Sequence, residues 1–86
     1  MKMSERQVIQ EILNTVDVKY DFENVDESQK HYTLLVTRQS NDRRDLKTVN
    51  QEMKHYFKAA DFSYDEDLNP DDNKKIDARV EIARQN

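Results

Sequence analysis

Residues Val8 to Phe22 read VIQEILNTVDVKYDF, and the spacing of the apolar side chains changes within this stretch. Up to Val16 the apolar residues fall on one face of an α-helix. From Val16 to Phe22 they alternate with polar residues, which is typical of a strand with one buried face. Ser4-Glu5-Arg6-Gln7 just before this stretch has the pattern of a capping box, with Ser4 as the N-cap. The sequence therefore predicts a helix that leads directly into a strand.

The same two patterns recur along the rest of the chain. The strand that ends near Glu23 is followed by polar turn residues at 24–29, a strand at 30–39, a helix at about 43–57, a strand at 60–65, an acidic loop at 66–73 and a strand at 76–83. The short turn predicts that the first two strands form a hairpin. We therefore predict one α+β domain over residues 1–86, of order αββαββ, with both helices on one face of a four-stranded, mostly antiparallel sheet.

The two halves of the chain, 4–39 and 45–85, resemble each other in element order. Residues 8–12 (VIQEI) and 49–53 (VNQEM) match in part. The same sequence offset aligns Ser4 with Asp45, the two expected helix caps. Such short matches also arise by chance. A duplicated αββ unit is therefore a hypothesis that rests more on the repeated order than on the repeated letters.

The composition argues against most enzyme motifs. The chain contains neither glycine nor cysteine, whereas phosphate-binding loops and nucleophile elbows need glycine, and disulfides and thiolate metal sites need cysteine. His31 and His55 lie on different predicted elements and form no metal-binding pair. We expect a non-enzymatic protein without cofactor or metal. We also expect it to be cytoplasmic, because the sequence shows no signal peptide and no apolar stretch of membrane-spanning length.

Acidic residues concentrate on one predicted face. If the even-numbered strand positions contact the helices, the outward positions carry seven carboxylates and two cations, Lys19 and Arg79, a net charge of −5 against −4 for the whole chain. The seven are Asp17, Asp21, Glu23, Asp61, Asp65, Asp77 and Glu81. Such a face either docks a basic partner or is an ordinary solvated surface whose charge opposes aggregation.

Basic residues gather around the second helix. Arg38, Arg43, Arg44, Lys47, Lys54 and Lys58 stand against Asp42, Asp45 and Glu52, which gives this segment a net charge of +3. A helix N-terminus beside Arg43 and Arg44 would suit phosphate, so nucleic-acid binding is the alternative hypothesis. The same residues are also consistent with a solvated helix face that contains internal ion pairs.

The aromatic residues argue against base stacking. All seven tyrosines and phenylalanines are expected in the core, whereas a single-strand binder of the open-sheet type needs rings on its exposed face. The stretch Asp65–Asp71 resembles a calcium loop, but Pro70 takes the place of the required glycine and Ile76 that of the bidentate glutamate. Leu35 is the apolar residue expected on the outward face, where it could mark a contact patch.

Three hypotheses follow from these patterns. The leading one is a regulator or inhibitor that docks a basic, nucleic-acid-handling protein through the acidic face; small phage-type inhibitors share this size and charge, an analogy of composition alone. The second is a nucleic-acid-binding accessory protein that uses the basic patch. The third is a homo-oligomer formed through the side of Leu35 or through an unpaired edge strand, so that both a monomer and a homodimer remain open.

Overall fold

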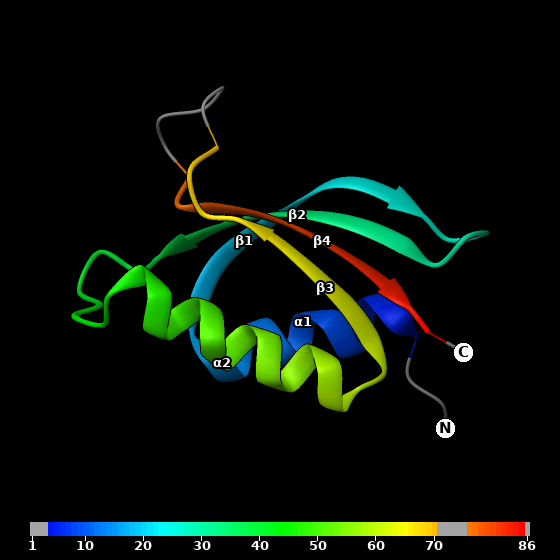
Figure 1. The fold of residues 1–86 in the computed structure, drawn as a ribbon, viewed down its shortest axis with the longest axis horizontal. Coiled ribbons are helices and arrows are strands. Elements are labelled where there is room, and N and C mark those ends of the chain that lie inside the picture. The colour runs from blue at the N-terminus through cyan, green and yellow to red at the C-terminus, as the bar shows by residue number, and fades with distance from the viewer. Residues whose placement is uncertain (1–3, 71–75, 86) are drawn as a thin grey trace.

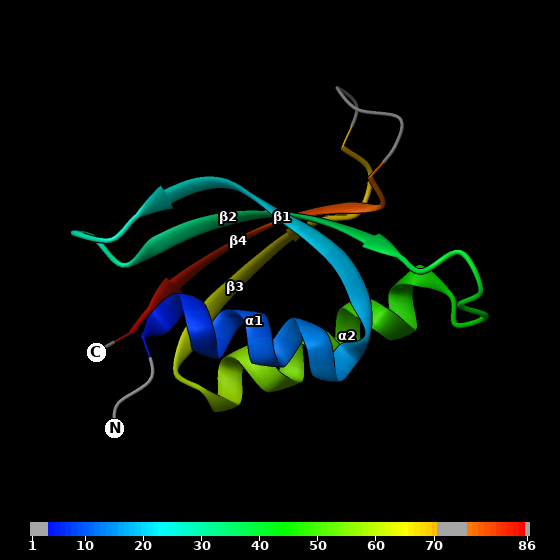
Figure 2. The same ribbon diagram turned by 180° about the vertical axis from the view of Figure 1, so that it is seen from behind.

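The computed structural model describes residues 4–70 and 76–85 and has the predicted order αββαββ (Figure 1). The elements are α1 (Glu5–Val16), β1 (Val18–Asp26), β2 (His31–Arg38), α2 (Leu46–Ala59), β3 (Phe62–Asp67) and β4 (Ala78–Arg84). The strands form one antiparallel sheet of order β1-β2-β4-β3, so that β1 and β3 are its edges. Figures 1 and 2 show both helices on the same face of this sheet, which confirms the predicted architecture. In the described part of the chain no helix is long and apolar enough to span a membrane.

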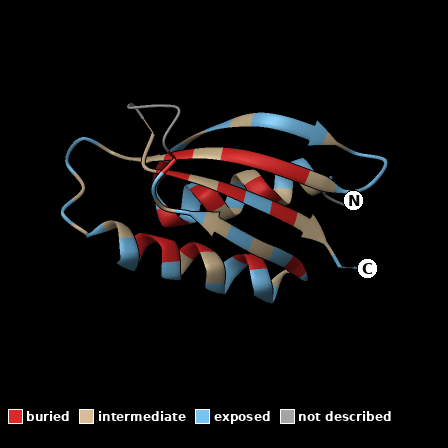
Figure 3. Cartoon of the chain, turned by 45° about the horizontal axis from the view of Figure 1, so that its top comes forward, coloured by how far each residue is buried: buried red, intermediate tan, exposed pale blue. Residues whose placement is uncertain are grey.

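The core lies between the helices and the sheet. Its largest buried side chains include Tyr32, Leu34 and Ile82 from the central strands and Met53 and Phe57 from α2. Figure 3 shows the buried positions concentrated on β2 and β4, with more exposure on the two edge strands. Neither helix covers the other face of the sheet (Figures 1 and 2).

One aromatic residue departs from the prediction. Tyr56 is 40% exposed and lies with its ring 5.4 Å from that of His55, outside the core. The reason is geometric, because the buried stripe of α2 is formed by Val49, Met53 and Phe57, and Tyr56 lies to one side of it. The expectation that all seven aromatics belong to the core was therefore wrong for this residue.

The helix caps fix where each helix begins. Ser4 forms the predicted capping box: its Oγ accepts from the Gln7 N–H at 3.2 Å, and the Gln7 side chain accepts from the Ser4 N–H at 2.9 Å. For α2 the N-cap is Asp45, whose carboxylate accepts from the Thr48 N–H at 2.8 Å. Helix α2 therefore begins at Leu46 and not at residue 43, because the extended backbone of the N-cap residue ends the preceding loop.

Two strands end later in the sequence than predicted. Strand β1 continues to Asp26 through a bulge between Phe22 and Asn24, where the register against β2 shifts. Strand β3 continues to Asp67, which pairs with Arg79 of β4. Polar composition alone had suggested turns at these places, whereas the ladder hydrogen bonds of the neighbouring strands extend the pairing.

Candidate protein-interaction surface

The sheet face opposite the helices carries most of the predicted acidic site. Because side chains alternate along a strand, the positions next to the core residues point away from the helices. We call this surface the outer face. Its charged residues are Lys19, Asp21, Glu23, Asp26, Asp65, Asp67, Arg79 and Glu81, six carboxylates and two cations, a net charge of −4.

Two of these carboxylates lie directly opposite each other. In the register of β3 against β4, Asp65 pairs with Glu81, and both residues are exposed. The Glu81 carboxylate also lies near His31, whose Nε2 is 3.5 Å from Oε1. Like charges at directly opposite positions of an antiparallel pair are destabilising. The fold therefore tolerates an unfavourable charge pair at this point of the outer face.

An ion pair crosses the middle of the outer face. Arg79 Nε donates to Glu23 Oε1 at 3.0 Å and Arg79 Nη2 donates to Glu23 Oε2 at 3.2 Å. The pair joins β4 to β1 across β2, and in the register Arg79 lies opposite Leu35. Leu35 is consequently half-buried in the monomer, although no helix covers it. It does not form an exposed apolar patch.

Asp17 and Asp61 do not belong to the outer face, contrary to the prediction. Each follows a helix, in the left-handed region with φ angles of 67° and 66°. Asp17 caps the C-terminus of α1, where its N–H donates to the carbonyls of Leu13 and Asn14. The alternation of strand residues begins only after these positions, so their side chains do not follow the phase of the sheet.

Asp77 is also separated from the outer face. Its Oδ2 accepts from Arg38 N at 2.9 Å and from Arg38 Nε at 3.0 Å at the end of the sheet. Both side chains are mostly shielded from solvent, with 33% of Arg38 and 27% of Asp77 exposed. This carboxylate is therefore engaged within the chain.

Asp67 belongs to the outer face although the prediction had placed it in the acidic loop. The signal that could have found it is the continued alternation of Tyr64, Glu66 and Leu68 with Asp65 and Asp67. Tyr64 and Leu68 pack against the core, which confirms that this phase extends to the end of β3. The alternation is hard to recognise in the sequence because the inward position between Tyr64 and Leu68 carries the acidic Glu66 instead of an apolar residue.

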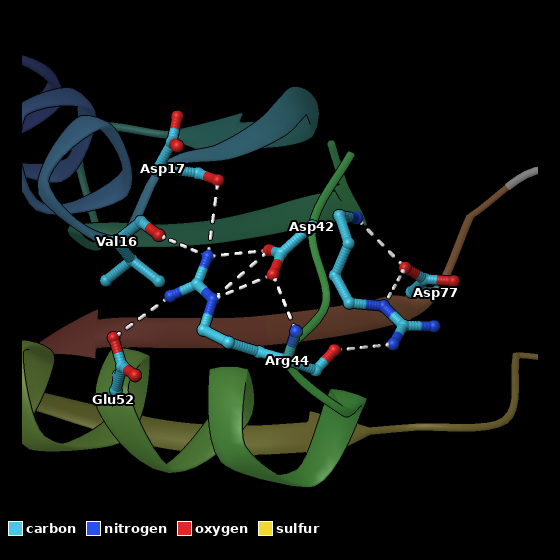
Figure 4. Close-up of polar contacts among 7 residues, drawn as sticks. Val16, Asp17, Asp42, Arg44, Glu52 and Asp77 are labelled. Atoms are coloured by element: carbon cyan, nitrogen blue, oxygen red, sulfur yellow. Dashed lines mark hydrogen bonds and ion pairs between the residues drawn. The ribbon is translucent and has the colours of Figure 1, made fainter. Parts of the chain in front are cut away.

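Arg44 is the most heavily bonded residue of the predicted basic patch (Figure 4). Its Nε and Nη2 donate to the Asp42 carboxylate at 2.9 Å and 2.6 Å, and its Nη1 donates to Glu52 at 3.1 Å. Its Nη2 also donates to the Val16 carbonyl at 2.7 Å. This guanidinium lowers the pKa of Asp42 to about 2, through hydrogen bonds to its carboxylate. Arg44 therefore joins the 39–45 loop to the end of α1 and to α2, and it is not available to a ligand.

The other basic residues do not form one surface. Arg38 is held by Asp77 and also donates to the Arg44 carbonyl at 2.9 Å, while Lys54 lies 3.9 Å from Glu66. Arg43, Lys47 and Lys58 are exposed. Arg43 and Arg44 lie before the N-cap in the sequence, outside helix α2. The N-cap itself is Asp45, so the first turn of α2 already contacts a carboxylate of its own chain. The anion site expected at this helix N-terminus is therefore occupied internally.

The described residues show no other chemical centre. No group of histidine and carboxylate side chains within 4–70 and 76–85 could hold a metal ion. Part of the stretch compared with a calcium loop, from residue 71 onward, lies outside the described residues. An open hollow of about 420 Å³ lies where α2 leads into β3, lined by Lys58, Asp61, Phe62, Ser63, Tyr64 and Gln85. Its lining residues include no histidine.

No protein-family model matches this chain, and comparisons with curated proteins and with solved structures give no match either. Its function is therefore inferred from the geometry and charge of its own residues.

Proposed function

We propose that the chain is a non-enzymatic, cytoplasmic interaction protein that docks a basic surface of a partner protein through the outer face. The opposition of Asp65 and Glu81 on neighbouring strands is the observation that supports this most directly. A cationic side chain of a partner placed between the two carboxylates would remove their mutual repulsion. The unfavourable charge pair of the free protein would thus become a favourable contact in the complex.

The side-chain composition of the outer face supports the same proposal. It carries no aromatic side chain among the described residues, since the rings of Tyr20, Phe22, Tyr32, Phe62 and Tyr64 all have the inward phase. Base stacking therefore has no platform there, and charge is the property that recognition would use. A protein that handles nucleic acid presents a basic surface of this kind. The concrete form of the proposal is a regulator or inhibitor of such a protein.

Reversal of one charge at the like-charge pair tests this proposal. Asp65→Lys should weaken binding of a fluorescent Lys/Arg-rich peptide by about tenfold, because a favourable pair becomes a repulsive one. The matched control is Glu11→Lys, which makes the same charge change at an exposed position of α1. Fluorescence anisotropy at low salt measures both variants. A protein captured from cells of the source should be retained by Glu11→Lys and lost by Asp65→Lys.

Two outcomes would contradict the proposal. Equal loss in both variants would show that the total charge matters and not the outer face. A mobility shift of DNA or RNA that is insensitive to Asp65→Lys but lost in Arg43→Glu and Lys47→Glu would favour the nucleic-acid alternative. Both of these cations are exposed, and neither forms an ion pair within the described residues.

A further inference from the structure

Strand β1 is an edge strand, and the hydrogen-bond pattern of the sheet shows which of its N–H and C=O groups are left without a partner strand. The Arg84 N–H donates to the Lys30 carbonyl, so the even-numbered residues of β2 bond toward β4 and the odd-numbered ones toward β1. Their partners on β1, Lys19 and Asp21 among them, bond toward β2. The N–H and C=O groups of the intervening residues, Val18, Tyr20 and Phe22, therefore point away from the sheet.

This free edge is regular over five residues. It begins at Val18 directly after α1 and ends at the bulge that follows Phe22. Figure 2 shows α1 beneath the sheet on this side, so that the helix does not cover the edge of β1. Unpaired edges of this kind are templates for another strand.

The side chains of this segment are complementary to a second copy of themselves. If two β1 strands pair antiparallel about a two-fold axis at Tyr20, Val18 lies opposite Phe22 of the second copy, and the outward main-chain groups face each other. Lys19 then lies opposite Asp21 of the second copy. By the two-fold symmetry, Asp21 also lies opposite Lys19 of the second copy, so the seam contains two such pairs. Both residues are exposed on the outer face, and neither forms an ion pair within the described residues.

The charges also select the register. Moving the axis by one residue to Lys19 keeps the outward groups facing each other, but it places lysine opposite lysine. Moving it to Asp21 places aspartate opposite aspartate, and Lys19 would then face Glu23 of the second copy, which lies in the bulge and is already bonded to Arg79. Like charges at opposite positions are destabilising, whereas opposite charges contribute about 0.2–1 kcal/mol per pair. The arrangement about Tyr20 is therefore the one in which main-chain pairing and side-chain charge agree.

The other edge of the sheet lacks this property. On β3 the Gln85 N–H donates to the Asp61 carbonyl, so Phe62, Tyr64 and Glu66 have the outward main-chain groups. A two-fold axis at Tyr64 would place Asp67 opposite Asp61 of the second copy. Strand β3 itself contains three carboxylates and no cation. Self-pairing at this edge is opposed by charge, which protects it.

We propose that the chain forms a homodimer in which two β1 strands pair antiparallel about Tyr20 and produce one continuous eight-stranded sheet. The outer faces of the two copies would then join into a single acidic surface, with Lys19 and Asp21 paired along the seam. This inference does not depend on the proposed docking function, since the like-charge pair of Asp65 and Glu81 lies away from the seam, toward β3.

An exchange of the two charges tests the dimer. Lys19→Asp alone and Asp21→Lys alone each place like charges opposite each other, so both should raise the dimer dissociation constant at least tenfold. The double variant Lys19→Asp/Asp21→Lys restores opposite charges in the same register and should return the constant to within about threefold of wild type. Sedimentation equilibrium at low salt measures all four proteins, and circular dichroism confirms that each is folded.

A second readout locates the contact. In the dimer, the amide protons of Val18, Tyr20 and Phe22 should exchange more slowly as the protein concentration rises, while those of Phe62 and Tyr64 on β3 should not. A wild-type protein that stays monomeric at millimolar concentration would overturn the proposal. So would a dimer that both single variants retain, or one that the double variant fails to restore.

Discussion

Asp17 and Asp61 occupy positions where most chains place glycine. Both follow a helix with positive φ, and Lys30 in the β1–β2 turn adopts a φ of 57°. The chain contains no glycine, so residues with a Cβ take these left-handed conformations at a cost in steric strain. Aspartate tolerates this region better than most residues, because its short side chain can bond locally. At Asp17 its charge also lies at the negative end of the α1 dipole.

The variant Asp17→Gly should therefore stabilise the protein. Removing the Cβ relieves the strain of the left-handed conformation, and removing the carboxylate relieves the helix dipole, for a gain of about 0.5–1 kcal/mol. Asp17→Asn retains the shape but not the charge, so it separates the two effects. Urea unfolding of the three proteins should give the order Gly, Asn, Asp from most to least stable. A less stable Asp17→Gly would show that the side chain makes a contribution that the backbone argument omits.

At the level of elements, Arg44 links three segments that the sheet does not connect. It contacts the Asp42 carboxylate in its own loop, Glu52 on α2 and the Val16 carbonyl at the end of α1. The carbonyls of the last turn of a helix have no partner within the helix, so the guanidinium satisfies one of them. Only a planar group with several donors can make these contacts together.

Replacement of Arg44 should be costly and pH-dependent. Arg44→Met should lower the free energy of unfolding by about 1–2 kcal/mol near neutral pH, because several charge-assisted hydrogen bonds are lost at a partly exposed site. The pKa of Asp42 is lowered to about 2 in the folded protein, below the ordinary 3.8, so its share of the stability is present above about pH 4 and disappears as the pH falls through about 2. The difference between wild type and variant should therefore shrink between about pH 4 and about pH 2. Arg43→Met, at the exposed neighbouring position, is the control and should change little at either pH.

The sequence predicts the helices and strands better than it predicts the contacts between them. Periodicity predicts elements well, because the alternation of Val18, Tyr20 and Phe22 directly reflects which side chains the core buries. Periodicity predicts the start of α2 too early, and the clustering of basic residues predicts Arg44 in a ligand site, where the structure has it bonded within the chain. The interactions of Arg44 join residues up to 28 positions apart, and nothing in the spacing of neighbouring letters encodes them. Strand phase likewise failed at Asp17 and Asp61, where the backbone leaves the strand conformation.

For the whole molecule, the outer face and the core impose different requirements on the same strands. The inward positions of β3 pack against α2, whereas the outward positions carry Asp65 and Asp67 beside β4. These two aspartates face opposite environments, since Asp65 lies opposite Glu81 and Asp67 opposite Arg79. Under the proposed docking function, both carboxylates would contact the basic partner.

Charge reversal at these two positions should separate stability from binding. Asp65→Lys places a cation opposite Glu81 and should raise the free energy of unfolding by about 0.5 kcal/mol. Asp67→Lys places a cation opposite Arg79 and removes the acceptor of the Asn69 N–H at 3.0 Å, so it should lower that free energy by about 1 kcal/mol. Both variants should nevertheless weaken binding of the Lys/Arg-rich peptide to a similar extent, because each reverses one carboxylate of the outer face. Urea unfolding and fluorescence anisotropy measure the two quantities on the same samples. Binding that follows stability, with Asp65→Lys binding as well as wild type, would mean that the outer face is only a solvated surface.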